Sequence, residues 1–151
     1  MTMELSKLLP NNHIILGLKG KTPEAIIRTL AKPLLDDHII SDLDAFTESV
    51  LEREKIFTTQ VKDNVAFPHA HADQVTNIAL VIGLTGPDGL TFAPNTPNKC
   101  RLFFLIAVPS HSPELHLELL ANLVDFVTSD KLDAALAVRT RAQLKKLLAN
   151  Y

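Results

Sequence analysis

Two stretches of the chain are almost continuously apolar over the length of a β-strand, Ile78–Leu84 and Leu102–Val108. Neither stretch alternates between apolar and polar residues, so both faces of each strand should be buried. We therefore expect these two strands to lie centrally in a sheet that helices cover on both sides.

Shorter patterns place further elements around these strands. A strand rich in β-branched residues is expected at residues 13–18, and a short one near Leu90–Phe92 within a turn-rich segment. Helical periodicity or capping signals mark segments at 4–9, from Thr22, from Ser41, and at about 113–128, 130–138 and 140–149. The apolar stripe of the helix at 113–128 is expected to be Leu117, Leu120, Leu123, Val124 and Val127.

The alternation of strands and helices predicts an α/β fold. We expect one domain over residues 1–151, built on a mixed sheet of about five strands with helices on both faces. A chain of 151 residues is long enough to bury a core of this kind.

Composition narrows the class of function. The net charge of −2, with 21% charged residues, gives no sign of nucleic acid or an anionic membrane as partner. The single Cys100 excludes an internal disulfide and a cysteine metal cage. The first residues lack the pattern of a signal peptide, and the longest apolar run is far shorter than the roughly 20 residues that span a bilayer. We expect a soluble, cytoplasmic protein without direct membrane insertion.

Residues 64–71, Asn-Val-Ala-Phe-Pro-His-Ala-His, are the strongest candidate for chemistry. A short apolar strand leads into Pro68, which fixes its own φ and favours extended geometry at Phe67. The chain then presents His69 just past the end of that strand, where functional side chains are often carried. Our hypothesis is that His69 is the chemical centre of the protein.

The other histidines differ in their surroundings. His13 and His38 adjoin apolar runs and are most simply edge or surface residues. His71, His111 and His116 fall near predicted strand ends or a helix start, so segments 64–71 and 109–116 are expected to converge at one edge of the sheet. The helix dipole favours a neutral imidazole at His116. A partly buried histidine bonded to a backbone carbonyl is the simpler interpretation of His116.

Arg53, Thr58 and Thr59 are candidates to bind an anion at His69. A guanidinium offers several donors in a fixed fork, and the threonines offer hydroxyl or amide donors. The alternative is a solvated charged turn at the end of the helix, followed by ordinary loop residues.

Four motifs occur in a fixed order: Glu52-Arg53-Glu54, Val65-Ala66-Phe67-Pro68-His69-Ala70, the run 102–109 and His116-Leu117-Glu118-Leu119-Leu120. Together they resemble the type-2 enzyme IIA family of the bacterial phosphotransferase system, in its fructose, mannitol and nitrogen-regulatory branch. The likeness extends over nearly the whole chain. Residues 58–64 contain no glycine where the family usually has a glycine-rich stretch, Phe67 is bulkier than the usual aliphatic residue, and His71 is an additional imidazole.

The resemblance implies a phosphocarrier, a phosphotransferase component that needs no cofactor and no metal. His69 would accept a phosphoryl group from an HPr-like phosphocarrier protein, or its nitrogen-branch equivalent, and pass it to an enzyme IIB or a regulatory target protein. His116 would position or hydrogen-bond the phosphoryl group, and Arg53 would stabilise the phosphorylated state. Transfer through histidine requires a neutral, exposed ring nitrogen, with positioning and charge stabilisation supplied by a few donors.

Two alternatives use the same residues differently. His69 and His71 lie on one side of an extended segment, and with His111 and His116 they would make a histidine site for zinc or copper. The second alternative is a regulatory protein of the same fold that binds partners, with or without phosphotransfer.

Overall fold

Five strands form one sheet within residues 4–60, 64–93, 98–112 and 114–151, which the computed structural model describes. The strands are β1 (Ile14–Leu18), β2 (Asn64–Ala66), β3 (His69–Ala72), β4 (Ala79–Thr85) and β5 (Cys100–Pro109). Their order is β1-β4-β5-β2, and β3 also pairs with β5. Only the β4–β5 pairing is antiparallel among these, so the sheet is mixed. The predicted fold class is confirmed.

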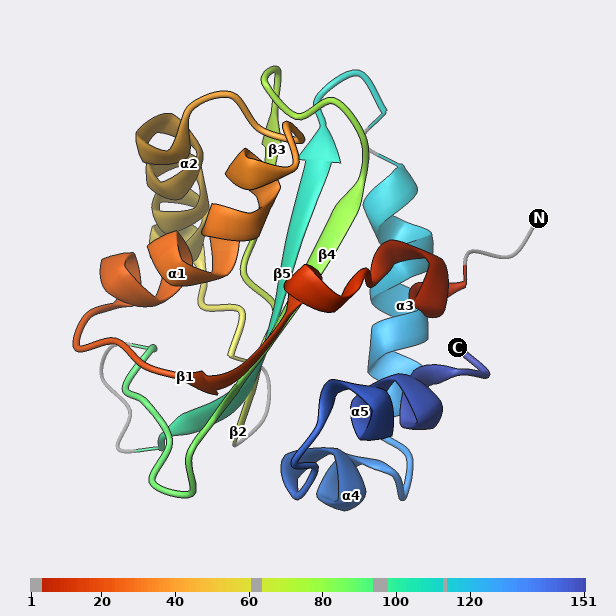
Figure 1. The fold of residues 1–151 in the computed structure, drawn as a ribbon. Helices are drawn as coiled ribbons and strands as arrows, with labels where there is room; N and C mark the ends of the chain where they lie inside the picture. Colours follow the sequence, from red (N-terminus) through yellow and green to blue (C-terminus); the bar gives the residue numbers. More distant parts are fainter. Residues whose placement is uncertain (1–3, 61–63, 94–97, 113) are drawn as a thin grey trace.

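The two apolar strands occupy the middle of the sheet, as their sequences predict. Every residue of β4 is buried, and β5 is buried along nearly its whole length. Each has a neighbouring strand on both sides, and helices cover both faces (Figure 1). A strand in this position leaves no face for polar residues, which explains the absence of alternation.

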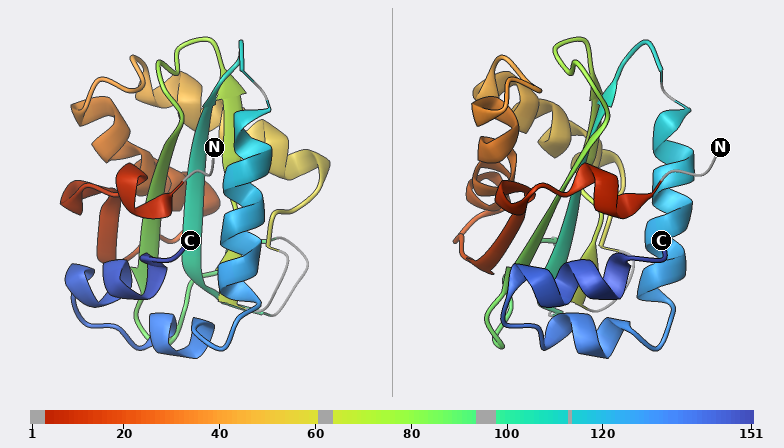
Figure 2. Two further views of the ribbon diagram at one scale, coloured as in Figure 1. Left: turned by 90° about the vertical axis from the view of Figure 1, so that its right-hand side faces the viewer. Right: turned by 45° about the vertical axis from the view of Figure 1, so that its right-hand side comes forward.

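Helices form a layer on each side of the sheet (Figure 2). The helical segments are the 3₁₀ turns η1 (Leu5–Leu8) and η2 (Asn11–His13), and the helices α1 (Pro23–Asp36), α2 (Leu43–Ile56), α3 (Leu115–Val127), α4 (Leu132–Leu136) and α5 (Arg141–Leu148). One hydrophobic core lies between the sheet and α1 with α2, and the other lies between the sheet and α3, α5 and η1. In the part of the chain that the structure describes, none of the helices is long and apolar enough to cross a membrane.

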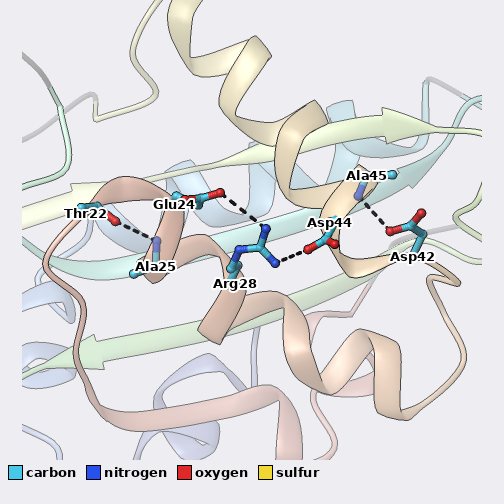
Figure 3. A network of polar contacts seen from close by, with 7 residues as sticks. All are labelled: Thr22, Glu24, Ala25, Arg28, Asp42, Asp44 and Ala45. Atoms are coloured by element: carbon cyan, nitrogen blue, oxygen red, sulfur yellow. Dashed lines mark hydrogen bonds and ion pairs between the residues drawn. The ribbon is translucent and has the colours of Figure 1, made fainter.

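The starts of α1 and α2 are fixed by side-chain caps (Figure 3). Thr22 accepts a hydrogen bond from the N–H of Ala25, and Pro23 occupies the first turn, as the sequence predicts. The second helix is capped by Asp42 and not by Ser41, so it begins slightly later than expected. Arg28 of α1 pairs with Asp44 of α2 and ties the two helix starts together.

One wrong prediction concerns the segment between β4 and β5. The expected strand near Leu90–Phe92 is reduced to a single bridge between Leu90 and Cys100. Phe92 is instead buried against the α1–α2 core, and the N–H of Ala93 donates to the Gln60 side chain at 3.2 Å, which takes it out of any ladder.

The buried face of α3 also differs from the predicted stripe. Leu117 and Val124 are 60% and 41% exposed, whereas Leu119 and Phe126 are buried beside Leu123. This helix carries apolar residues on more than one face, so periodicity alone did not determine which face packs on the sheet.

His13 is buried, which corrects its assignment as an edge or surface residue; His38 is exposed as predicted. The Nδ1 atom of His13 lies 3.0 Å from the carbonyl oxygen of Leu80, and its Nε2 atom lies 2.9 Å from Oδ2 of Asp37. The pKa of Asp37 is lowered by hydrogen bonds from Asn12 and then from His13. The ring therefore links the end of α1 to the central strand β4.

We predict that His13→Ala lowers the free energy of unfolding by about 1–3 kcal/mol, because it leaves the buried Leu80 carbonyl without its partner. Chemical denaturation with urea measures this change. The matched control is His111→Ala at an exposed position, for which we expect less than about 0.5 kcal/mol. Equal losses in both variants would contradict a structural role for His13.

Candidate active site

His69 is the first residue of β3, at the edge of the sheet, and not in a loop past a strand end. Phe67 and Pro68 interrupt the edge strand, and β2 and β3 both pair in parallel with β5 on either side of this break. Pro68 has no N–H to donate, but its carbonyl accepts from Ile106 of β5 at 2.9 Å. The chain therefore keeps its direction through the proline, and His69 sits on a rigid strand.

The break in the strand fixes the proton on the His69 ring. Its Nδ1 atom lies 2.9 Å from the carbonyl oxygen of Phe67. A carbonyl oxygen can only accept, so Nδ1 carries the hydrogen and donates it. In the neutral ring the lone pair consequently resides on Nε2, the nitrogen on the opposite side.

The pKa of His69 is lowered, mainly because burial disfavours the charged ring. The hydrogen bond to Phe67 opposes this effect, and the positive charge of Arg53 and the neighbouring rings of His116 and His71 add to it. The direction of this shift keeps His69 neutral at physiological pH. Burial, charge and hydrogen bonding thus give a ring with an available lone pair.

An open cleft of about 670 Å³ lies over His69. Its walls come from three elements that are distant in sequence: α2, β3 and α3. The lining residues are Ser49, Glu52, Arg53, Lys55, Ile56, His69, Ala70, His71 and His116. The structure thus brings His69, Arg53 and His116 together, as the sequence analysis expected.

Arg53 reaches the cleft from the last turn of α2. One of its guanidinium nitrogens, Nη1, donates to the carbonyl oxygen of Phe57 at 2.8 Å, just beyond the end of that helix. This bond satisfies a carbonyl that the helix leaves unpaired and holds the arginine in place. Arg53 therefore presents a positioned positive charge beside His69.

His71 and His116 form a pair within the cleft. The Nε2 atom of His71 lies 3.1 Å from Nδ1 of His116, with the two rings nearly perpendicular. The ring of His116 is nearly parallel to that of His69, with centroids 5.8 Å apart. His116 is the second residue of α3, as the sequence predicted for a first-turn position. One ring nitrogen of His116 is therefore held by His71 while its face lies towards His69.

The geometry gives His71 a contact that the sequence analysis did not assign. The alternation of side chains along a strand places residues 69 and 71 on one face. This alternation is the sequence feature that could have placed His71 near the site. Its contact with His116 depends on the packing of α3, which the strand pattern does not contain.

The four-histidine metal site is not supported. His111 is exposed and does not line the cleft. Across residues 4–60, 64–93, 98–112 and 114–151, no group of three or more His, Cys, Asp or Glu side chains is arranged to hold a metal ion. The nitrogens of His71 and His116 that face each other are directed at one another and not at a shared centre.

Thr58 and Thr59 lie outside the residues that line the cleft. Thr59 is buried, its N–H donates to the carboxylate of Glu54 at 3.0 Å, and its hydroxyl donates to the same carboxylate. The hydroxyl of Thr58 accepts from the N–H of Gln60 at 3.2 Å. Direct binding of a phosphoryl group by these threonines stays a prediction, and Thr59 would have to leave Glu54 to make it.

The arrangement suits nucleophilic chemistry at a single ring nitrogen. A neutral imidazole offers the Nε2 lone pair, and an arginine and two further imidazoles surround it. The arginine and the imidazoles can donate hydrogen bonds to an anion, and the arginine also offers a positive charge.

Sequence comparison identifies relatives of this protein. Residues 7–151 match the family model described as "Phosphoenolpyruvate-dependent sugar phosphotransferase system, EIIA 2". The fructose-specific EIIA component of Haloferax volcanii is 30% identical over 80% of this chain and 77% of its own length. The fructose-specific EIIABC component of Bacillus subtilis is 29% identical over 80% of this chain, and the chain spans about a fifth (19%) of that longer protein.

Solved structures share the fold. The nitrogen regulatory protein IIA-Ntr of Neisseria meningitidis superposes with a TM-score of 0.83 at 20% identity, over 95% of this chain and 97% of that one. The enzyme IIA mannitol of Escherichia coli, solved in complex with phosphorylated enzyme IIB mannitol, superposes with a TM-score of 0.80 at 23% identity, over 95% and 98% of the two chains.

The family model covers nearly the whole chain, and three of the four motifs that suggested the resemblance contribute residues to the cleft: Glu52 and Arg53, His69 and Ala70, and His116. The chain belongs to the EIIA type 2 family of the phosphoenolpyruvate-dependent sugar phosphotransferase system.

Proposed function

We propose that this protein is a phosphocarrier that accepts a phosphoryl group on Nε2 of His69 and passes it to another protein. The observation that carries the proposal is the bond from His69 Nδ1 to the Phe67 carbonyl, which leaves the Nε2 lone pair as the nucleophile. The lowered pKa of His69 supports it, because a protonated ring has no lone pair to offer.

The transfer needs no proton acceptor. The Nε2 lone pair forms a bond to phosphorus while the phosphorus–nitrogen bond of a phosphohistidine donor breaks, and the donor ring keeps the released electron pair. Nδ1 retains its hydrogen throughout, so the phosphorylated ring is cationic. The hydrogen bond from Nδ1–H to the Phe67 carbonyl stabilises this positive charge. No metal and no cofactor enters this step.

Arg53 and His116 would stabilise the phosphorylated state. Arg53 places a permanent positive charge beside His69, which favours a group that brings about two negative charges. His116 lines the same cleft with its ring beside that of His69, so it is placed to donate to a phosphoryl oxygen. Their contribution is positioning and electrostatic stabilisation, the main sources of catalysis in phosphoryl transfer.

The proposed donor is an HPr-like phosphocarrier protein and the proposed acceptor is an enzyme IIB. The cleft is open and lies at a sheet edge, which allows another protein to reach His69. Ile56, which lines the cleft, and the adjacent Phe57 are 81% and 73% exposed, and a partner protein would cover them. Exchange with such carriers would take place in the cytoplasm.

Sugar uptake is the favoured role, because two relatives near 30% identity carry fructose-specific names. Regulation through the phosphorylation state is the second candidate. The likeness to the nitrogen regulatory protein concerns the fold, at 20% identity.

We predict that His69→Ala abolishes acid-labile phosphate on this protein in a mixture of phosphoenolpyruvate, enzyme I and the HPr-like protein of the same cell. Mass spectrometry of the intact chain measures the added phosphoryl group. Labelling in His111→Ala should match the wild type, since that ring lies outside the cleft. An acid-labile phosphate that persists in His69→Ala would refute the assignment.

His116→Ala should still accept the phosphoryl group but pass it on about 10–100-fold more slowly. The estimate is the loss of one hydrogen bond that His116 makes to the transferring phosphoryl group in the transition state, worth about 1.5–3 kcal/mol. Rapid-quench transfer from the phosphorylated protein to enzyme IIB gives the rate. Unchanged transfer kinetics would remove His116 from the mechanism.

The rate of phosphoryl acceptance should be flat near neutral pH and fall on the acid side, because the neutral ring is the nucleophile and the pKa of His69 is lowered. The decline should therefore begin below about pH 6.5, where an ordinary histidine is already half protonated. Arg53→Gln removes one cause of the lowered pKa, so its acid limb should move to higher pH. Single-turnover rates across pH 5–8 check both statements, and an acid limb that moves to lower pH would contradict them.

A further inference from the structure

Glu54, in the last turn of α2, binds Thr59 after the end of the helix, and nothing in the proposed chemistry uses this contact. Its carboxylate accepts the N–H of Thr59 at 3.0 and 3.2 Å and also accepts the Thr59 hydroxyl. Thr59 is buried, so these bonds replace water at two donors. One side chain therefore fixes both the backbone and the side chain of Thr59.

The hydrogen bonds continue from Thr59 to the imidazole. The carbonyl of Thr59 accepts the N–H of Phe67 at 3.2 Å, and the carbonyl of Phe67 accepts Nδ1–H of His69 at 2.9 Å. The N–H and the carbonyl of Phe67 belong to the same residue. A change in the backbone orientation of Phe67 would therefore affect both hydrogen bonds. Glu54 is thus connected to the His69 ring through Thr59 and Phe67.

Glu54 does not reach the cleft over His69. It lines a separate cavity of about 760 Å³ between α2, the start of α1 and residues 91–93, whereas its neighbours Arg53 and Ile56 line the cleft of His69. A phosphoryl group on His69 would therefore meet Arg53 and not Glu54. The hydrogen bonds of Glu54 reach towards His69 through Thr59.

Residues 57–60, between α2 and β2, belong to no helix or strand, and side-chain hydrogen bonds hold them in place. Arg53 binds the carbonyl of Phe57, Glu54 binds Thr59, and the Gln60 side chain accepts from the N–H of Ala93 at 3.2 Å. Removing Glu54 would leave two buried donors of Thr59 without partners and allow this segment to shift. The Phe67 backbone would lose its fixed orientation.

We propose that Glu54 is a positioning residue that holds the Phe67 carbonyl in place and thereby keeps the hydrogen of the His69 ring on Nδ1. The inference rests on the proposed function of His69 as phosphoryl acceptor. Without the bond to Phe67, the ring also populates the form with hydrogen on Nε2, and that form has no lone pair at the reacting nitrogen. Arg53 then acts on the phosphoryl group, whereas Glu54 acts on the position of the hydrogen of the His69 ring.

The test is Glu54→Gln, examined by two measurements. The ¹⁵N chemical shifts of the His69 ring at pH 8, where the ring is neutral, report which nitrogen carries the hydrogen. We expect the variant to show a mixture of both forms where the wild type shows Nδ1–H. Single-turnover acceptance from the phosphorylated HPr-like protein should slow by up to about tenfold, the equivalent of one hydrogen bond.

Matched variants separate positioning from a general loss of structure. Glu48→Gln makes the same change one turn and a half earlier on α2, at an exposed residue outside the cleft of His69, and should match the wild type in both measurements. Thr59→Val removes the hydroxyl and keeps the N–H, so it should shift the ring spectrum in the same direction but less. Thr59→Ser restores the hydroxyl and should restore the Nδ1–H form. The Thr59 pair also keeps the proposal testable if Glu54→Gln does not fold.

The outcomes distinguish this inference from the function on which it rests. If the wild type is phosphorylated on His69 while Glu54→Gln keeps both the wild-type spectrum and the wild-type rate, the positioning role is overturned and the carrier function stands. A slower rate with an unchanged ring spectrum also overturns it, because the proposed route runs through the ring hydrogen. If the wild type accepts no phosphoryl group, the carrier function fails, whatever the spectra show.

Discussion

The hydrogen bond from His69 Nδ1 to the Phe67 carbonyl is the contact on which the site depends. The Pro68 carbonyl accepts from Ile106 of β5, while the Phe67 carbonyl before it accepts from the ring two residues on. Both β2 and β3 pair in parallel with β5, so the edge strand continues in the same direction on either side of Pro68. The edge strand around Pro68 thus supports a single imidazole whose Nδ1 hydrogen is held, which leaves Nε2 as the proposed nucleophile.

The two-sided core places the other groups of the site. One core fixes α2 on one face of the sheet and the other fixes α3 on the opposite face, so each helix brings one end to the edge where β3 lies. Arg53 comes from the last turn of α2 and His116 from the first turn of α3. A cleft between two layers at an open edge is accessible to a large partner, which fits phosphoryl exchange between proteins.

The electrostatics of the cleft bear on the resting His69 ring and on the proposed phosphorylated ring. Burial and the adjacent Arg53 lower the pKa of His69 and keep the resting ring neutral. In the proposed function, the same Arg53 charge would stabilise a dianionic group attached to the ring. The His71–His116 contact holds the His116 imidazole beside that of His69. A few fixed charges and donors would therefore serve both states of the proposed phosphocarrier.

The sequence by itself determined the elements and the candidate residues, because those signals are local. Apolar runs predicted β4 and β5, Thr22 and Pro23 predicted the start of α1, and ordered motifs led to the enzyme IIA family and to His69, Arg53 and His116. Only the tertiary structure decided which face of α3 is buried, that His13 joins β4 to Asp37, that His71 meets His116, and that Glu54 holds Thr59. Each of these depends on how packed elements or a non-repeating turn orient a side chain, and no local periodicity encodes that orientation.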